Sequence, residues 1–269
     1  MRFPCRPRQI DCFARKVFWS SRNDPEKQHC ANPDDLCHPY AINRRIIINS
    51  LEIQKMRQAV QTLGVTLSEE QIEKLSRFHT LVQEWNTKVN LISRRDIDNL
   101  LANHTMDSLS AIPVLIAGGS TLEVMDLGSG GGFPGIPLKI CLPEIKLTCL
   151  EATQKKARFI ELAIAELGLS GVVVIAKHSQ AVQKDIALLN RYDFVTARAV
   201  AELKELVKIS FPFLKVGGKL LAYKSSKAGQ EIAAAGEIIN KLGGTIEGEL
   251  RQEQEPSDKD RKIIIIRKE

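Results

Sequence analysis

The chain has 269 residues, 43% of them hydrophobic, and a formal net charge of +6. This length and composition fit one large domain with a sizeable core, and no apolar run approaches the roughly 20 residues that a membrane-spanning helix needs. Residues 1–50 carry +4 of the charge, so the remaining 219 residues are nearly neutral, which permits nucleic-acid binding without requiring it. We expect a cytoplasmic protein with no membrane partner.

Residues 1–50 differ from the rest of the chain. They hold five of the eleven prolines and show no sustained helical or strand period, so we predict a disordered leader. An organelle transit peptide and an over-extended start, with the working protein beginning nearer Met56, explain the same pattern. Four cysteines lie here in two Cys-x6-Cys pairs, a spacing too wide for the usual structural zinc knuckle, and we expect no metal site.

Residues 51–118 are predicted to form a helical cap. The first helix covers residues 51–63. The second begins at Ser68, which forms a capping box with Gln71 and precedes an apolar stripe at intervals of three to four residues. A third helix is predicted over residues 104–115, before a pair of glycines.

Residues 119–269 alternate between strand and helix patterns. Strands are predicted at residues 122–127, 146–151, 172–176, 192–197 and 219–223, helices at 154–167 and 230–242, and a closing antiparallel pair of strands at 245–250 and 262–267. Strands separated by helices of this length indicate βαβ units. The predicted fold is therefore α/β, a doubly wound, mostly parallel, seven-stranded Rossmann-like sheet with an N-terminal helical cap.

A glycine-rich turn follows the first predicted strand, in the sequence DLGSGGGFPG that begins at Asp126. Glycines allow a ligand to approach the backbone closely, and ligands of open α/β sheets bind at this edge. Read from Gly130, the loop matches the dinucleotide pattern G-x-G-x-x-G, with Glu151 as the acid for the ribose. A tight turn with no ligand is a further reading.

Read from Asp126 and Gly128, the same loop begins where the strand ends. This register places a carboxylate at the strand tip, which suits an ammonium group better than a pyrophosphate. S-adenosylmethionine carries an ammonium, a sulfonium and a ribose but no phosphate, and Glu151 would accept its ribose hydroxyls in either register. We therefore favour S-adenosylmethionine, with Asp126, Gly128 and Gly130 as cofactor-binding residues.

Five segments resemble the ribosomal RNA small-subunit methyltransferase G family, also called glucose-inhibited division protein B. In chain order they are Trp85-Asn86 with Asn90-Leu91, His104-x-x-Asp107-Ser108-Leu109, Asp126 to Pro137 (DLGSGGGFPGIP), Glu151 with Lys155-Lys156, and Thr196-Ala197-Arg198-Ala199. The resemblance runs from about residue 67 onward. It implies a class I methyltransferase fold and methylation of the N7 atom of a guanine in 16S ribosomal RNA, with that RNA or the small ribosomal subunit as partner.

The resemblance also implies which residues contact S-adenosylmethionine. They are Gly128 and Phe133 in the glycine loop, Glu151, Ala152 and Thr153 after the second strand, Ser179 and Gln180 beside the adenine, and Arg198 after the fourth strand. The chain departs from the family at two places. His178-Ser179-Gln180 replaces Arg-x-Glu, so that no carboxylate holds the adenine amine there, and Lys224 is followed by Ser225-Ser226 in place of glycine.

The chemistry of guanine N7 explains the lack of a catalytic base. N7 has a lone pair and no proton in the neutral base, so alignment and desolvation supply most of the acceleration. Arg198 and Lys224 are our candidates for positioning the substrate, through RNA phosphate or guanine O6, with surface cations as the alternative. We interpret His104 and Asp107, three residues apart on one helix, as a pair that packs the cap onto the sheet.

Two other functions stay open at this point. A small-molecule methyltransferase on the same fold would use the cap to close a dry apolar pocket, whereas an RNA enzyme would leave an open basic entrance. A nucleotide-binding or RNA-binding module without catalysis is the third reading, because one fold hosts many functions. We expect the protein to act as a monomer.

Overall fold

The computed structural model describes residues 50–225, 228–251 and 261–269. The predicted leader and its cysteines, like Ser226, therefore lie outside the described residues. All described residues belong to one compact unit. None of the helices in this described part is both long and apolar enough to cross a membrane.

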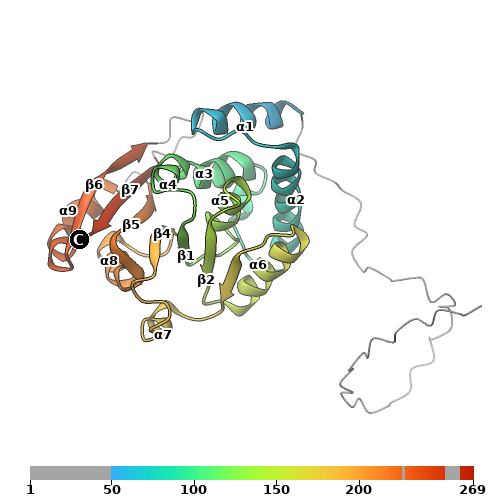
Figure 1. The fold of residues 1–269 in the computed structure, drawn as a ribbon. Coiled ribbons are helices and arrows are strands. Elements are labelled where there is room, and N and C mark those ends of the chain that lie inside the picture. Colours follow the sequence, from blue (N-terminus) through green and yellow to red (C-terminus); the bar gives the residue numbers. More distant parts are fainter. Residues whose placement is uncertain (1–49, 226–227, 252–260) are drawn as a thin grey trace, which may run out of the picture. The chain divides into compact units, whose positions relative to one another are not determined.

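A seven-stranded sheet with the order β3-β2-β1-β4-β5-β7-β6 lies at the centre (Figure 1). Its strands are β1 Glu123–Leu127, β2 Lys146–Leu150, β3 Val172–Ile175, β4 Tyr192–Arg198, β5 Leu214–Lys224, β6 Gly244–Arg251 and β7 Lys262–Lys268. Neighbouring strands are parallel, except that β7 runs antiparallel to both β5 and β6. The predicted doubly wound sheet and its closing antiparallel pair are confirmed.

Helices cover both faces of this sheet and form the cap. They are α1 Ser50–Thr62, α2 Glu69–Asn86, α3 Asp107–Leu109, α4 Ile112–Ala117, α5 Gly135–Cys141, α6 Gln154–Glu166, α7 Ser179–Val182, α8 Leu203–Ser210 and α9 Ala228–Lys241, with the shorter or irregular turns η1 Arg94–Asp96, η2 Leu101–Met106 and η3 Phe211–Phe213. The predicted capping box is present, because Ser68 accepts from the Gln71 amide and Gln71 accepts from the Ser68 amide.

The prediction of one continuous third helix in the cap is wrong. The segment begins with a π-helical turn, η2, continues as α3, and breaks at Ser110 before α4. Pro113 lies at the start of α4, where its missing amide hydrogen is tolerated. A π-helical turn widens the helix by one residue and often marks a functional site.

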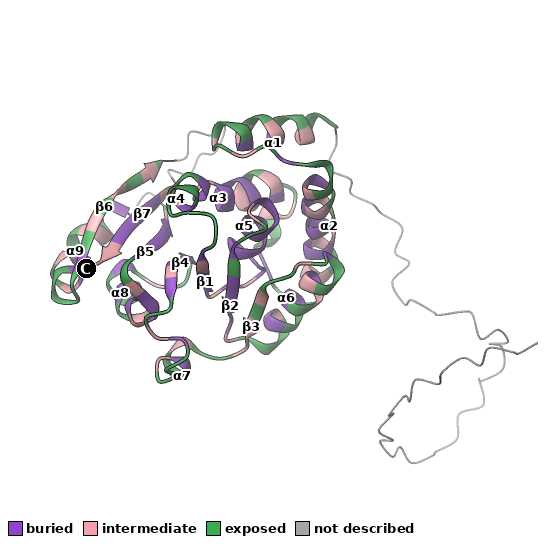
Figure 2. Cartoon of the chain, in the orientation of Figure 1, coloured by how far each residue is buried: buried purple, intermediate pink, exposed green. Residues whose placement is uncertain are grey.

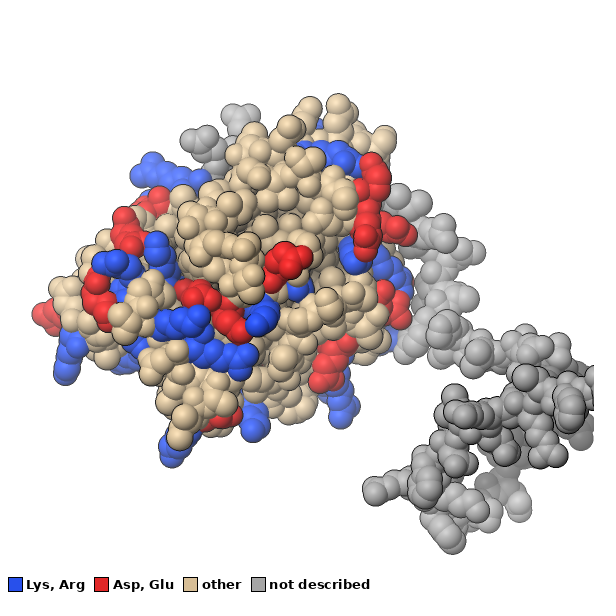
Figure 3. Space-filling view, in the orientation of Figure 1, with Lys and Arg blue, Asp and Glu red and all other residues tan. Residues whose placement is uncertain are grey.

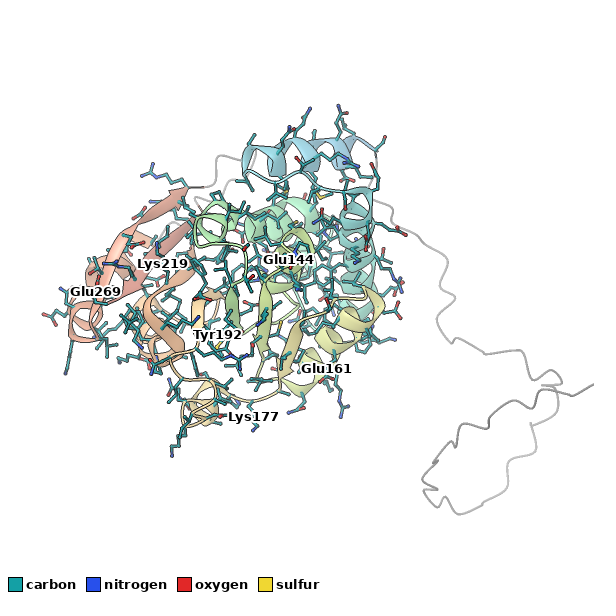
Figure 4. The ribbon with its side chains drawn as sticks, viewed as in Figure 1. Glu144, Glu161, Lys177, Tyr192, Lys219 and Glu269 are labelled. Carbon is teal, nitrogen blue, oxygen red and sulfur yellow. The ribbon has the colours of Figure 1, made fainter. Side chains whose placement is uncertain are left out.

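The fifth strand also differs from its prediction. β5 begins at Leu214, so Gly217 and Gly218 lie within the strand and do not form a turn before it. A Cβ on Gly218 would lie 2.9 Å from the Tyr192 carbonyl oxygen, which explains why this crowded position carries no side chain. Tyr192, labelled in Figure 4, begins β4 and donates a hydrogen bond to Thr148 in the sheet.

Two hydrophobic clusters cover the two faces of the sheet. In β1, Val124 points into the cluster that includes the cap and helices α5 and α6, whereas Met125 points into the cluster that includes α8 and α9. Figure 2 shows the central strands as the most buried part of the fold. Because Phe78 of α2 packs on Phe133 and Phe159, the cap and the sheet share one core.

Candidate functional site

A cleft of about 800 Å³ opens at the carboxyl ends of the central strands. This is the edge at which open α/β sheets bind ligands. Six of the predicted site residues line it: Gly128, Gly130, Phe133, Glu151, Arg198 and Lys224. Asp126, Ala152, Thr153, Ser179 and Gln180 are not among the lining residues.

The glycine loop forms the floor of this cleft. The Gly128 amide donates to the Leu150 carbonyl at 2.8 Å, which ties the loop to the end of β2. Gly128 and Gly130 have φ values of 71° and 56°, which side chains rarely adopt. A Cβ on Gly130 would meet only the Gly128 carbonyl oxygen within 4 Å, at an ordinary contact distance of 3.8 Å. The loop therefore presents bare backbone to the cleft.

Asp126 has a different place from the one predicted. Its carboxylate is completely buried behind the loop, where it accepts hydrogen bonds from the Gly135 amide and the Thr196 hydroxyl, both at 3.1 Å. Burial raises the pKa of this carboxyl to about 6. A side chain in this position holds the two ends of the glycine loop together and does not face the cleft, so the ammonium contact predicted for Asp126 does not match the geometry.

Glu151 lies at the end of β2 and faces the cleft. One carboxylate oxygen accepts from the Gly130 amide at 2.8 Å, and the other accepts from the Thr153 amide at 2.7 Å. Each oxygen keeps a further lone pair. The glycine loop and the turn after β2 thus fix a carboxylate that can accept two vicinal hydroxyls.

The turns beyond Glu151 lie outside the cleft wall. Thr153 occupies the N-cap position of α6 without a side-chain capping hydrogen bond, while Ser179 and Gln180 begin α7 after β3. Gln180 is exposed, and Ser179 is half-buried. The contacts predicted for Ala152, Thr153, Ser179 and Gln180 with the cofactor stay predictions.

Arg198, the last residue of β4, connects the sheet to the cap. Its guanidinium donates to the Asp107 carboxylate at 3.1 Å and to Nδ1 of His104 at 2.7 Å. It also lies over the Phe133 ring, 5.2 Å from the centroid. His104 and Asp107 therefore meet through the arginine. They do pack the cap onto the sheet, as interpreted, but Arg198 is the residue that connects them.

The contact with Arg198 determines the tautomer of His104. A guanidinium has only donors, so Nδ1 must accept and the ring proton is on Nε2. Burial, together with the Arg198 charge, lowers the pKa of His104 to about 3. Nε2 is buried without a hydrogen-bond partner among the described residues, and Asp96 lies 3.7 Å from it. His104 is thus a neutral acceptor in the wall of the cleft.

Arg261, just before β7, is a site residue that the sequence reasoning missed. It lines the cleft beside Arg198, lies 3.4 Å from the same Asp107 oxygen, and donates to the Asn103 carbonyl. The π-helical turn presents that carbonyl to both arginines, since Arg198 also reaches it at 3.5 Å. Only the folded chain brings these residues together, because Arg261 is more than 150 positions from Asp107.

Lys224 also lines the cleft, but its ammonium group is already paired. Its ammonium lies 2.6 Å from the Glu231 carboxylate and donates to the Ala201 carbonyl. Glu231 also accepts from the Leu203 amide at 2.7 Å. These contacts hold the turn after β4, in which Ala199 has a φ of 55°, unusual for a residue with a side chain.

Charges of both signs occur on the surface and in the cleft. On the face shown in Figure 3, Lys and Arg are interspersed with Asp and Glu. The cleft itself is lined by four carboxylates and four cations, namely Asp107, Glu151, Glu202, Glu231, Lys156, Arg198, Lys224 and Arg261. The site is therefore polar and charged, and the cap contributes to this charge.

The sequence matches a known family over most of its length. The family model described as rRNA small subunit methyltransferase G matches residues 71–254. A protein of that name from Streptococcus pneumoniae serotype 19F (strain G54) is 36% identical over 205 residues, which cover 76% of this chain and 86% of the relative. The protein of the same name from Dehalococcoides mccartyi (strain CBDB1) is 34% identical over 209 residues, covering 78% and 88%.

Solved structures with a similar fold are more distant in sequence. A Corynebacterium glutamicum protein superposes with a TM-score of 0.51 at 17% identity, covering 80% of this chain and 96% of that chain. The TYW2 protein of M. jannaschii, in complex with AdoMet, gives a TM-score of 0.50 at 16% identity, covering 68% and 80%. At these identities the likeness concerns the fold.

Proposed function

The chain belongs to the ribosomal RNA small subunit methyltransferase G family, and we propose that it methylates the N7 atom of a guanine in small-subunit (16S) ribosomal RNA. It is an enzyme, and its methyl donor is S-adenosylmethionine. The observation that carries the proposal is the cleft that the glycine loop and Glu151 line together with Arg198, which contacts His104 and Asp107 of the cap. The glycine loop and Glu151 suit a nucleoside, and the arginine suits an anionic group.

The residues of the cleft fit S-adenosylmethionine. Gly130 leaves open the space that a Cβ would fill, and the Glu151 carboxylate is held by two backbone amides with lone pairs left for ribose hydroxyls. Phe133 supplies an apolar wall next to the loop. We propose Gly128, Gly130, Phe133, Glu151 and Arg198 as residues that contact the cofactor, with Asp126 acting from behind the loop.

The mechanism needs no proton transfer by the protein. When bound, S-adenosylmethionine supplies an electrophilic methyl group on its sulfonium. Guanine N7 offers a free lone pair, so the chain's residues have only to align the two reactants and exclude water. His104 is neutral and its Nδ1 is occupied by Arg198, which agrees with a positioning role and not with that of a general base. Arg198 would hold the RNA, and Glu151 would orient the ribose.

We propose RNA and not a small molecule as substrate because the family that the chain matches is described as an rRNA methyltransferase. The cap lines the cleft with Asn103, His104 and Asp107 as well as Leu91 and Ile92, so it does not enclose a dry apolar pocket. We propose that residues 51–118 serve as this cap and residues 119–269 as the cofactor-binding domain. We further propose that the enzyme acts as a monomer in the cytoplasm, where its ribosomal substrate is found.

The test uses tritiated S-adenosylmethionine and small ribosomal subunits that lack their native methylation. The RNA is then digested and the labelled nucleoside is identified. Label in 7-methylguanosine, lost in the Arg198→Ala variant, supports the cofactor, the substrate and the reaction together. Unlabelled RNA, from a protein that still binds the cofactor, would refute the ribosomal substrate and favour a small-molecule methyltransferase. Failure to bind the cofactor would favour a non-catalytic binding module.

A further inference from the structure

Two arginines from distant strands converge on one carboxylate in the wall of the cleft. Arg198 ends β4, Arg261 precedes β7, and their guanidiniums lie 3.1 Å and 3.4 Å from the same oxygen of Asp107. We propose that Arg198 and Arg261 together form an oxyanion site, and that Arg261 binds a carboxylate or phosphate group of a reactant. This inference rests on the proposed function and extends it to a residue outside the family motifs.

The two guanidiniums share one directly contacting carboxylate within the described part of the chain. Both contact Asp107, whereas the other carboxylate nearby, Asp96, lies 3.7 Å from Nε2 of His104 and contacts the side-chain amide of Asn103. His104 adds no charge, because its Nδ1 accepts from Arg198 and the ring is neutral. The other shared partner, the Asn103 carbonyl, is uncharged. An anion from the cleft would give the second guanidinium a charged partner that it does not have to share with the first.

The geometry also leaves donors available on Arg261. Its contacts to Asn103 and Asp107 within the described part of the chain both use Nη1. A guanidinium has five N–H donors in a planar fork, so the Nη2 and Nε side of the group can bind a two-oxygen acceptor. The side chains of Arg261 and Arg198 are 14% and 15% exposed, and both line the cleft. Both side chains are thus largely buried and still accessible from the cleft.

Two reactants bring a suitable oxyanion to this wall. S-adenosylmethionine has a carboxylate at its amino-acid end, and the glycine loop that would receive this end is joined to Arg198 through Phe133. An RNA nucleotide has phosphate oxygens, for which arginine is the preferred bidentate donor. In both cases Arg261 would bind a group in which two oxygens share a negative charge. A cofactor carboxylate would show in the affinity for S-adenosylmethionine, and an RNA phosphate would show in the KM for RNA.

The experiment compares Arg261→Ala and Arg261→Lys with the wild type, and uses Arg267→Ala as the matched control. Arg267 lies on β7, carries the same charge, pairs with Glu247 and Glu269, and is not among the residues that line the cleft. S-adenosylmethionine affinity is measured by calorimetry without RNA. The KM for small-subunit RNA, and its dependence on salt, are measured at saturating cofactor. Circular dichroism and thermal unfolding monitor the fold.

If the oxyanion is the cofactor carboxylate, Arg261→Ala weakens S-adenosylmethionine binding about tenfold or more, the range for one charge-assisted hydrogen bond. If it is an RNA phosphate, cofactor affinity is unchanged, while KM rises by a similar factor and the salt slope falls by about one. Arg261→Lys keeps the charge and recovers only part of the loss, because an ammonium lacks the fork. Arg267→Ala changes neither quantity.

An Arg261→Ala variant that is folded, and whose cofactor affinity and KM both stay within twofold of the wild type, overturns the inference. If Arg261→Ala does not fold, Arg261→Lys is used in its place, because the lysine charge can still pair with Asp107. A cofactor affinity and a KM equal to those of the wild type in Arg261→Lys would also overturn the inference. The cofactor arm does not depend on the RNA substrate. A wild type that leaves RNA unlabelled therefore contradicts the proposed function, while a cofactor affinity that is the same in wild type and variant contradicts the carboxylate site.

Discussion

Glu231 lies 2.6 Å from the ammonium of Lys224, and the same carboxylate oxygen accepts the backbone amide of Leu203. Lys224 in turn donates to the Ala201 carbonyl. The two side chains thus hold both ends of the turn after β4, which forms a wall of the cleft. Lys224 is a positioning residue in this arrangement, because its charge is already satisfied within the protein.

We predict that Glu231→Gln reduces the rate of methyl transfer while the protein stays folded. The change leaves the Lys224 charge unpaired and loosens the turn, and a misplacement of about 1 Å can reduce rates roughly 100-fold. We expect kcat to fall about tenfold or more with cofactor affinity little changed, measured by steady-state kinetics and calorimetry. Glu205→Gln is the control, since Glu205 pairs with Lys208 in solvent and 55% of its side chain is exposed. Equal kcat values for the two variants would contradict the positioning role.

Glu151→Gln should weaken S-adenosylmethionine binding. The carboxylate is held by the Gly130 and Thr153 amides, and a hydrogen bond to a charged group contributes about 1.5–3 kcal/mol, or about 10- to 150-fold in affinity. Calorimetry checks the affinity. Glu161→Gln, on the exposed side of α6 (Figure 4), should bind as the wild type does. An unchanged affinity for Glu151→Gln would remove Glu151 from the cofactor site.

Gly130→Ala separates backbone strain from ligand contact. Gly130 has a φ of 56° and Gly168 a φ of 59°, and a Cβ on either meets no close neighbour. Both alanine variants should lose about 1–2 kcal/mol of unfolding free energy, because L-residues disfavour this region. Only Gly130→Ala should also lose cofactor affinity, by about tenfold, since its methyl projects into the cleft. Similar affinities for the two variants would show that the cofactor does not touch the loop there.

Asp126→Asn tests the position of this carboxylate behind the loop. The Asn oxygen can still accept from the Gly135 amide, and the completely buried site holds an uncharged group more easily than an ion. We expect stability at pH 7 to be equal or higher than in the wild type, with cofactor affinity within about threefold, less than the loss of one hydrogen bond to a charged group would cause. A loss of tenfold or more in affinity, with stability retained, would instead restore the ammonium contact predicted from the sequence.

The stability of the fold should decrease in acid because of His79. This side chain is buried, pairs with the Thr105 hydroxyl at 2.6 Å, and has its pKa lowered by burial from 6.5 to about 4. Because the folded-state pKa is depressed, its contribution is fully present above pH 6.5 and is lost as pH falls toward 4. The lowered pKa corresponds to about 3 kcal/mol. Denaturant unfolding of wild type and His79→Gln at several pH values should show the flatter profile in the variant, and parallel profiles would be evidence against this role.

Local patterns in the sequence were sufficient for the sheet and for parts of the cap. The capping box at Ser68 depends on residues three positions apart, and each central strand is an apolar run before a turn, so both can be recognised without the fold. The glycine loop and Glu151 could be paired because parallel strands bring their carboxyl ends to one edge of the sheet.

The remaining features depend on contacts between distant parts of the chain. The sequence of the π-helical turn at Leu101–Met106 does not differ from that of an ordinary helix. The Asn103 carbonyl of this turn accepts hydrogen bonds from Arg198 and Arg261, which are distant in the sequence. Asp126 reads as a strand-tip acid, but Thr196 and Gly135 draw its carboxylate behind the loop. The short helices α5, α7 and α8 were not predicted, because segments of four to eight residues give too short a periodic pattern.

The order of the strands has a consequence for the synthesis of this enzyme. β6 precedes β7 along the chain, yet β7 lies between β5 and β6 in the sheet. A growing polypeptide therefore leaves the hydrogen-bonding edge of β5 vacant, and β6 without its neighbour, until residues 262–268 leave the ribosome. Arg261 immediately precedes this strand, so the cleft acquires its second guanidinium only when β7 docks. A nascent chain without β7 thus contains the glycine loop but lacks Arg261, the second arginine of the proposed anion site.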